Sequence, residues 1–288
     1  MSGARELREL LGRGETFLVP GAYNALVARV LELEGFPVLY AGGYAAAAAN
    51  YALPDIGLVT QTEMVDHIAR IVGAVDLPII ADADTGFGEL TNTARAVREY
   101  ESAGVAAIQL EDQVFPKRCG HMEGKRVVPT DAMVEKIRAA LAARSSADTV
   151  IIARTDAIAV TGLEDAIRRL RAYETAGADV LFPDAPRSVK EMREIRAAVT
   201  LPLVANMSEH GKTPLLSRDE IAELKYEIAL YPSSTLFAAA QSARETARAL
   251  ASAGTTRDAL DRLMVFGELN EDVLGLSAWQ EGERRAAG

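Results

Sequence analysis

Short apolar runs alternate along this chain with longer stretches of helical periodicity. Eight of these runs predict buried strands, because each is short and mainly apolar. They span Phe17–Pro20, Val38–Ala41, Pro78–Asp82, Ala106–Glu111, Val150–Thr155, Asp179–Pro183, Leu201–Asn206 and Glu227–Tyr231. Between them, apolar positions spaced like Ala166, Leu170 and Tyr173 predict amphipathic helices that pack on the strands.

Glycines mark the passage from helix to strand. Gly35, Gly104 and Gly177 each stand shortly before a predicted strand, where a left-handed helix C-cap is expected. The segments 98–104 (REYESAG) and 171–177 (RAYETAG) are similar to each other, which indicates a repeated βα unit. An open doubly wound sheet has the same alternation. Eight strands, and no G-x-G-x-x-G motif after the first, favour an α/β fold of the (β/α)₈ TIM-barrel type.

No Pro/Gly/Ser-rich linker divides the chain, so residues 1–288 are expected to form a single barrel domain. Residues 256–288 form a C-terminal segment, helical to Trp279, with a small polar tail from Gly282 that is expected to fray. The segment carries more apolar residues than one closing helix needs, among them Leu260, Phe266 and Leu274. This surplus indicates packing against another subunit.

Composition narrows the class of protein. A net charge of -10 and a pI near 5.0 argue against a nucleic-acid partner, which needs a basic surface. The single Cys excludes an intrachain disulfide and favours a cytoplasmic location. The charged N-terminal residues resemble neither a signal nor a transit peptide, and no apolar run is long enough for a membrane span.

Acidic residues follow three successive strands. Asp82 and Asp84 end one apolar run with their side chains on the same side, Glu111 ends the next, and Asp156 follows the fifth. Strand ends of a parallel barrel share one rim, so these carboxylates are expected to meet there. Two adjacent carboxylates repel unless a cation or proton lies between them, and oxygen ligands suit Mg²⁺ better than zinc. A metal site is therefore favoured over simple helix capping.

Residues 115–129 (FPKRCGHMEGKRVVP) form a basic, glycine-punctuated loop around Cys119. Nearby cations lower the pKa of a thiol, so Cys119 is a candidate acid/base and the loop a candidate lid. His67, in contrast, lies among Val65, Ile68 and Ile71 in a helical pattern, which favours a structural role.

The motif Lys117-Arg118-Cys119-Gly120-His121, with Asp82-Ala83-Asp84 before it and Asn206 after it, resembles the isocitrate lyase/phosphoenolpyruvate mutase superfamily from about Phe17 to about Trp279. The resemblance implies metal binding by Asp82, Asp84 and, through water, Glu111; catalytic roles for Tyr40, Asp55, Lys117, Cys119 and His121; and substrate contacts from Gly42, Gly43, Tyr44, Gly120, Arg154, Asp184, Asn206, Ser208, Phe237 and Phe266.

The same resemblance implies a Mg²⁺ cofactor, with Mn²⁺ as a substitute, and a small anionic carboxylate substrate. It also implies that the C-terminal helix is exchanged within a homodimer, and that such dimers assemble into a homotetramer. In the implied reaction a carbon–carbon bond breaks in a retro-aldol step and Cys119 protonates the carbanion.

Departures from the family pattern bear on the substrate. Methylisocitrate lyases hold extra carboxylates with two arginines at the positions of Phe237 and Phe266, which disfavours a tricarboxylate here. Gly42 replaces the usual Ser or Thr, and Asp184 the usual Glu. We expect Mg²⁺-dependent cleavage of a 2-hydroxy dicarboxylate of the 2,3-dimethylmalate type to pyruvate and a carboxylate. The alternatives are carboxyphosphonoenolpyruvate phosphonomutase, methylisocitrate lyase or oxaloacetate hydrolase, and a non-catalytic barrel.

Overall fold

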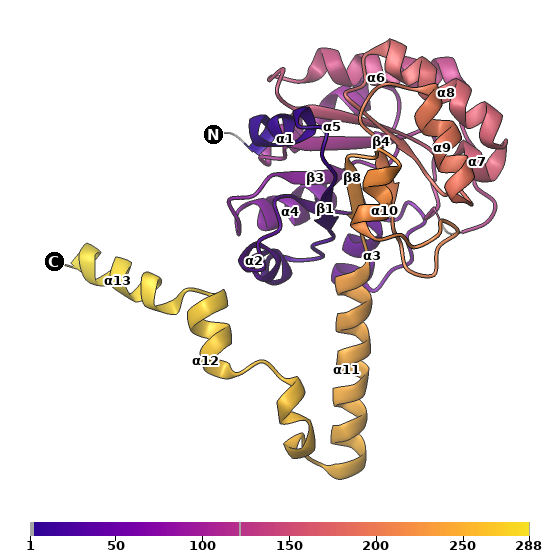
Figure 1. Ribbon diagram of the computed structural model, residues 1–288. Helices are drawn as coiled ribbons and strands as arrows, with labels where there is room; N and C mark the ends of the chain where they lie inside the picture. The colour runs from indigo at the N-terminus through magenta and orange to yellow at the C-terminus, as the bar shows by residue number, and fades with distance from the viewer. Residues whose placement is uncertain (1–2, 121, 288) are drawn as a thin grey trace.

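A computed structural model describes residues 3–120 and 122–287. Short buried strands form its centre (Figure 1). They are β1 (Phe17–Pro20), β2 (Leu39–Ala41), β3 (Ile79–Asp82), β4 (Ala107–Glu111), β5 (Val150–Thr155), β6 (Val180–Pro183), β7 (Val204–Asn206) and β8 (Ile228–Tyr231). Each overlaps an expected strand. β3 begins directly after Pro78, which lacks an N–H, and β7 begins only at Val204, because the Leu203 N–H donates to Glu227 Oε2 over 2.8 Å.

The strands pair in parallel and close into a barrel. One set runs β2-β3-β4-β5-β6 and the other β1-β8-β7. Single bridges between Gly21 and Tyr40 and between Leu181 and Leu203 join the two sets, so β1 meets β2 and β6 meets β7. The (β/α)₈ barrel expected from the sequence is confirmed.

Helices surround the barrel. They are α1 (Gly3–Gly12), α2 (Ala25–Leu33), α3 (Gly43–Tyr51), α4 (Gln61–Val72), α5 (Leu90–Ser102), α6 (Thr130–Ala143), α7 (Ala157–Val160), α8 (Leu163–Ala176), α9 (Val189–Ala198), α10 (Arg218–Glu223), α11 (Ser234–Ala253), the 3₁₀-helix η1 (Arg257–Arg262), α12 (Phe266–Glu268), the π-helix η2 (Leu269–Val273) and α13 (Leu276–Ala287). Gly35, Gly104 and Gly177 have positive φ, as expected for helix-ending glycines. None of the described helices is both long enough and apolar enough to cross a membrane.

Two apolar layers follow from the alternation of side chains along each strand. Residues such as Ile151 and Leu181 point outward against the helices, whereas Val150, Ile152 and Val180 fill the interior of the barrel. Leu7 of α1 packs into the interior cluster and is fully buried. The interior is therefore solid at the end covered by α1, which leaves the opposite end for a site.

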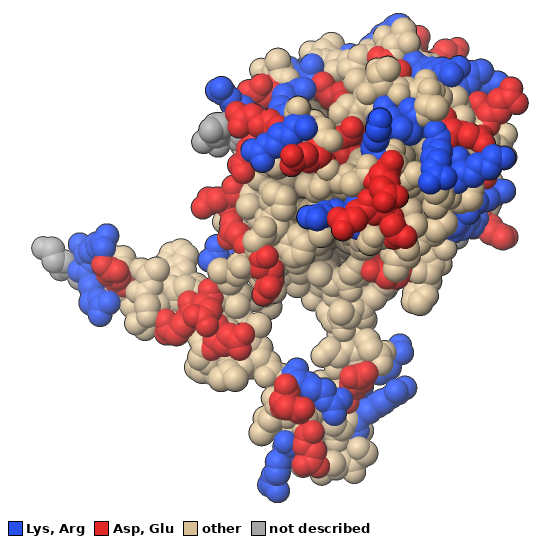
Figure 2. All heavy atoms as spheres, viewed as in Figure 1, with Lys and Arg blue, Asp and Glu red and all other residues tan. Residues whose placement is uncertain are grey.

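The C-terminal segment forms an arm, which we define as α11 to α13. In Figures 1 and 2 it stands away from the barrel, and no residue of α11 is buried within the described chain. η2 returns to α2, where Arg29 Nε donates to the Val273 carbonyl over 3.3 Å. The arm also corrects two expectations. The helix expected from Thr256 to Trp279 is interrupted at residues 263–265 and again at Gly275, which has positive φ, and the tail from Gly282 continues α13 as helix.

Candidate active site

The alternation that fills the barrel also determines which polar side chains face its open end. On β5, Val150 and Ile152 point inward, so Arg154 does too. On β4 the same register directs Gln109 and Glu111 inward, and both are buried. The other inward positions near the strand ends are Tyr40, Asp82, Phe182, Asp184 and Asn206.

A cleft of about 340 Å³ opens at this end of the barrel. Barrel residues form its floor, and the loop between β4 and α6 (residues 112–129) forms one wall with Lys117, Cys119 and Met122. The remaining predicted residues that line it are Gly42, Gly43, Tyr44, Asp55, Gly120, Ser208 and Phe237. One cleft thus gathers most of the residues that the sequence assigned to a site.

Asp82 is held by three donors. Its Oδ1 accepts from Gln109 Nε2 at 3.2 Å and from the Asp84 backbone N–H at 3.0 Å, and its Oδ2 accepts from the Gly43 N–H at 3.1 Å. Tyr40 OH donates to Gln109 Oε1 over 3.2 Å, which orients the amide so that its NH₂ faces Asp82. Burial first, and then Asp82, raise the pKa of Tyr40 well above its usual value, so the phenol remains a donor.

Lys117 joins two of the acids. Its Nζ lies 2.7 Å from Asp55 Oδ1 and 2.7 Å from Asp84 Oδ1, and its side chain is 3% exposed. Burial lowers the pKa of Lys117, but the surrounding carboxylates outweigh it and raise the pKa well above its usual value. Burial also raises the pKa of Asp84 to about 6 in spite of Lys117. The pKa of Glu111 is likewise raised well above its usual value, mainly by burial. Burial thus outweighs the nearby cations at both carboxylates.

The donor set fits a Mg²⁺ ion. Asp82, Asp84 and Glu111 offer only oxygen, and Glu111 Oε1 is buried without a hydrogen-bond partner among the described residues. Within the described chain, no three His, Cys, Asp or Glu side chains are grouped closely enough to hold a metal unaided. Mg²⁺ does not need such a group, because it commonly binds one or two carboxylates and completes its shell with water and substrate oxygens.

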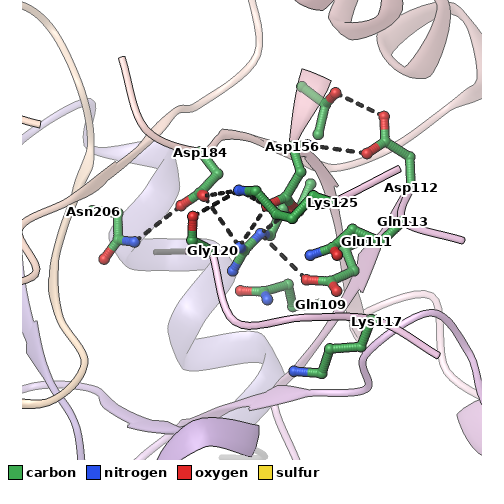
Figure 3. Close-up of polar contacts among 12 residues, drawn as sticks. Gln109, Glu111, Asp112, Gln113, Lys117, Gly120, Lys125, Asp156, Asp184 and Asn206 are labelled. Atoms are coloured by element: carbon green, nitrogen blue, oxygen red, sulfur yellow. Dashed lines mark hydrogen bonds and ion pairs between the residues drawn. The ribbon is translucent and has the colours of Figure 1, made fainter. Parts of the chain in front are cut away.

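A second ionic cluster centres on Arg154, and Figure 3 labels its members Glu111, Asp156, Asp184 and Asn206. Arg154 Nε lies 2.9 Å from Asp156 Oδ2 and 3.4 Å from Glu111 Oε2, and its Nη2 lies 3.3 Å from Asp184 Oδ2. Asn206 Nδ2 donates to Asp184 Oδ1 over 3.2 Å. Although burial alone would raise it, Arg154 and Lys125 hold the pKa of Asp156 well below its usual value. Arg154 is thus a fixed, buried cation that faces the cleft.

Close approach explains two of the glycines. A Cβ on Gly120 would lie 2.5 Å from Asp184 Oδ2 and 2.8 Å from Arg154 Nη2. A Cβ on Gly43 would lie 3.1 Å from Asp84 Oδ1 and 3.2 Å from Asp82 Oδ2. The backbone therefore approaches both ionic clusters more closely than a side chain would permit.

Cys119 lies in the cleft wall and is partly exposed. Its backbone N–H donates to the Asp55 carbonyl over 3.0 Å, and the Met122 N–H donates to its carbonyl over 2.8 Å. Tyr44 faces the same cleft, and burial first, then Cys119 and Asp55, raise the pKa of its phenol. The loop thus places Cys119 in the wall of the cleft that Asp82 and Glu111 also line.

Two predicted site residues are not brought together with the rest. His121 lies outside the described residues. Phe266 is on α12, 81% exposed, and does not line the cleft of its own chain. Within its own chain the arm carries Phe266 away from the barrel, and its contribution to a site stays a prediction.

Two polar residues of the site were not predicted from the sequence, Gln109 and Lys125. Gln109 supports Asp82, and its signal was a lone amide on the inward face of an otherwise apolar strand. Lys125 is buried against Asp156 and Asp184, although its sequence context is a basic loop that predicts exposure. Nothing local in the sequence distinguishes Lys125 from its neighbour Arg126.

Comparison with known proteins identifies the family. A family model described as phosphoenolpyruvate phosphomutase matches residues 7–251. The chain belongs to the PEP mutase/isocitrate lyase superfamily. It is similar to a 2,3-dimethylmalate lyase from Eubacterium barkeri, with 43% identity over all of this chain and 99% of the relative. It is also 44% identical to a 2-methylisocitrate lyase from Aeropyrum pernix, over 96% of this chain and 88% of the relative.

Solved structures of this superfamily have the same fold. A crystal structure of 2,3-dimethylmalate lyase matches all of this chain and 96% of its own with a TM-score of 0.94 and 38% identity. Phosphonopyruvate hydrolase in complex with oxalate and Mg²⁺ matches with a TM-score of 0.90 and 32% identity, over the full length of both chains. The named lyases among its homologues make this chain an enzyme of the carbon–carbon lyase type.

Proposed function

We propose that this enzyme is a Mg²⁺-dependent lyase that cleaves a 2-hydroxy dicarboxylate of the 2,3-dimethylmalate type into pyruvate and a carboxylate. The observation that carries the proposal is the mixed lining of one cleft. Buried acids and Arg154 line it together with aromatic and aliphatic side chains, among them Tyr44, Phe237 and Leu230. Such a cleft suits a substrate whose reacting half is oxygen-rich and whose other half carries alkyl groups.

The oxygen-rich half belongs at the rim acids. Asp82, Asp84 and, through water, Glu111 are the residues that would hold Mg²⁺, with Mn²⁺ as a substitute. When bound, the ion would stabilise negative charge on the 2-oxygen of the substrate. Arg154 and Asn206 face the same space and are suited to a carboxylate, since a guanidinium and an amide both donate N–H groups. A small anion can thus bind inside a chain of net charge -10.

The loop between β4 and α6 carries the residue that would protonate the product carbanion. As a carboxylate of the cleft takes the proton of the 2-hydroxyl, the C2–C3 bond breaks, C2 becomes a ketone and the electron pair stays on C3. The Cys119 thiol gives its proton to that carbon, and the loop that carries it lies between the cleft and solvent. The same loop limits the access of water to the carbanion.

The apolar part of the lining, which we call the apolar wall, selects among substrates. Tyr44 and Phe237 meet edge-to-face with ring centroids 6.1 Å apart, and Leu230 and Pro232 also line the cleft. A third carboxylate would need a cation there, and these residues offer none. We therefore place methyl substituents, rather than the extra carboxylate of methylisocitrate, against Tyr44 and Phe237.

The arm suggests the assembly. Leu260, Val265, Phe266 and Trp279 are all more than 60% exposed, which is unusual for large apolar side chains in an isolated chain. We propose that two chains exchange their arms, that Phe266 then approaches the partner subunit's cleft, and that such dimers form a homotetramer. With a single cysteine and no intrachain disulfide, the enzyme is expected in the cytoplasm.

A substrate panel tests the proposal. Purified enzyme is incubated with Mg²⁺ and 2,3-dimethylmalate, other 2-substituted malates, oxaloacetate or methylisocitrate, and 2-oxo acid or oxalate release is measured. We expect the highest kcat/KM with an alkyl-substituted malate, and loss of activity in EDTA that Mg²⁺ restores. Activity on methylisocitrate alone would contradict the assignment. A phosphonomutase would be revealed by a C–P resonance in ³¹P NMR with a carboxyphosphonoenolpyruvate substrate.

A further inference from the structure

A buried lysine links the cysteine loop to the barrel. Lys125 Nζ lies 2.7 Å from the Gly120 carbonyl, 2.7 Å from Asp156 Oδ1 and 3.4 Å from Asp184 Oδ2. Its side chain is only 2% exposed. Figure 3 shows it reaching between Gly120 and the two aspartates. Its three contacts match the three donors of an ammonium group, which leaves none for a substrate.

The two aspartates belong to fixed parts of the barrel. Asp156 directly follows β5, and Asp184 directly follows β6. Asp156 is tied further by its N–H, which donates to Asp112 Oδ1 over 3.0 Å, and by Arg154. Lys125 therefore connects the residue next to Cys119 to the rigid ends of two strands.

The contact is held by charge. Burial lowers the pKa of Lys125, but Asp156 and Asp184 outweigh it and raise the pKa above its usual value, so the group stays ionised. Hydrogen bonds from a charged donor are about twice as strong as neutral ones. Asp55 and Gln113 hold the backbone at Cys119 and Arg118 on the other side of the loop. Among the described residues, Lys125 ties the Gly120 carbonyl to the ends of β5 and β6.

We propose that Lys125 is a positioning residue that fastens the Cys119–Gly120 segment over the cleft, and so determines how often the thiol is in place to deliver its proton. This inference rests on the proposed function for its effect on turnover. Its effect on the loop does not depend on the reaction, so the two can fail separately.

The chain's single cysteine provides the measurement. Cys119 alkylation by iodoacetamide is followed by mass spectrometry in the full-length wild type, Lys125→Met and Arg126→Met. Arg126 is the matched control, because it is the next basic residue of the same loop and its side chain is exposed. We expect Lys125→Met to be alkylated about tenfold faster than wild type, and Arg126→Met to match wild type.

Turnover is measured on the same proteins. We expect Lys125→Met to lose roughly 10–100-fold in kcat with little change in KM, since the substrate's own contacts remain. Gly120→Ala provides a second variant should Lys125→Met fail to fold. Its Cβ would meet Asp184 and Arg154, so it should loosen the same segment, and speed alkylation, without a change of charge.

Alkylation rates within twofold of Arg126→Met for every folded variant would overturn the proposal, whatever happens to kcat. A loss of kcat in Lys125→Met with unchanged alkylation would also overturn it, because Lys125 would then act on the charge of the cleft and not on the loop. If the wild type has no lyase activity but the alkylation rates differ as expected, the positioning role of Lys125 is supported and the proposed reaction is wrong.

Discussion

Acid should destabilise this enzyme through one histidine far from the chemistry. His67 lies on α4 with Met64, Ile68 and Ile71, is 6% exposed and does not line the cleft, in keeping with the structural role expected from its apolar neighbours. Its Nδ1 lies 2.8 Å from Asn50 Nδ2. The Asn50 amide can donate to Nδ1 only if Nδ1 carries no proton, as in a neutral imidazole. Burial first, and Arg70 second, lower the pKa of His67 from 6.5 to about 4.

The direction of the pH effect follows from the two pKa values. Between about pH 6.5 and pH 4 the unfolded chain binds a proton at His67 that the folded chain does not, so stability falls as the pH falls through this window. Between pH 7 and pH 5 the loss is about 2 kcal/mol, because the unfolded histidine is almost fully protonated at pH 5 and the folded one is not.

Urea unfolding followed by circular dichroism at pH 7 and pH 5 measures this loss, and His67→Gln is the control. The glutamine carbonyl can still accept from Asn50, but the side chain does not titrate. We expect the free energy of unfolding of wild type to drop by about 2 kcal/mol more than that of His67→Gln over this pH range. Carboxylates titrate in both proteins and cancel in the comparison. Equal drops would refute the reasoning, as would a larger drop in the variant.

Three further predictions concern the site and the arm. Cys119→Ser should lower kcat by roughly 10²–10⁴-fold in the 2-oxo acid assay while the circular dichroism spectrum stays unchanged, and near-normal turnover would remove the thiol from the mechanism. Phe237→Arg should raise the ratio of kcat/KM for methylisocitrate over that for 2,3-dimethylmalate by about tenfold, since it brings a guanidinium to the apolar wall; an unchanged ratio would contradict our placement of the substrate. A chain that ends at Gly254 should form particles with fewer subunits in light scattering than the full chain does, and an unchanged number of subunits would show that the arm beyond α11 does not hold them together.

The sequence predicted the barrel and its rim because both follow from one short-range rule. Alternation along a strand fixes which side chains face inward, so Asp82 and Glu111 could be placed at one rim from the strand pattern, whereas Tyr40 and Arg154 were assigned through the family resemblance. Loops have no such period. That Lys117 lies between Asp55 and Asp84 depends on how a long loop folds back on the barrel, and the resemblance to a family, not the spacing, pointed to it.

Lys125 and Phe266 show opposite limits of reading a sequence. For Lys125 the limit is physical: a lysine and an arginine stand side by side in a basic loop, and only the folded chain separates the buried one from the exposed one. For Phe266 the limit is that a family resemblance and a single chain describe different things. Resemblance to a family reports positions around a complete site, whereas a single chain shows only what its own residues build, and here the arm carries Phe266 away from the cleft. If arms are exchanged, both views hold, because each cleft then receives this residue from the other chain. In that case residues of two subunits would contact the half of the substrate that does not react. A change at Phe266 should then alter substrate selectivity only in an enzyme that still forms the arm-exchanged dimer.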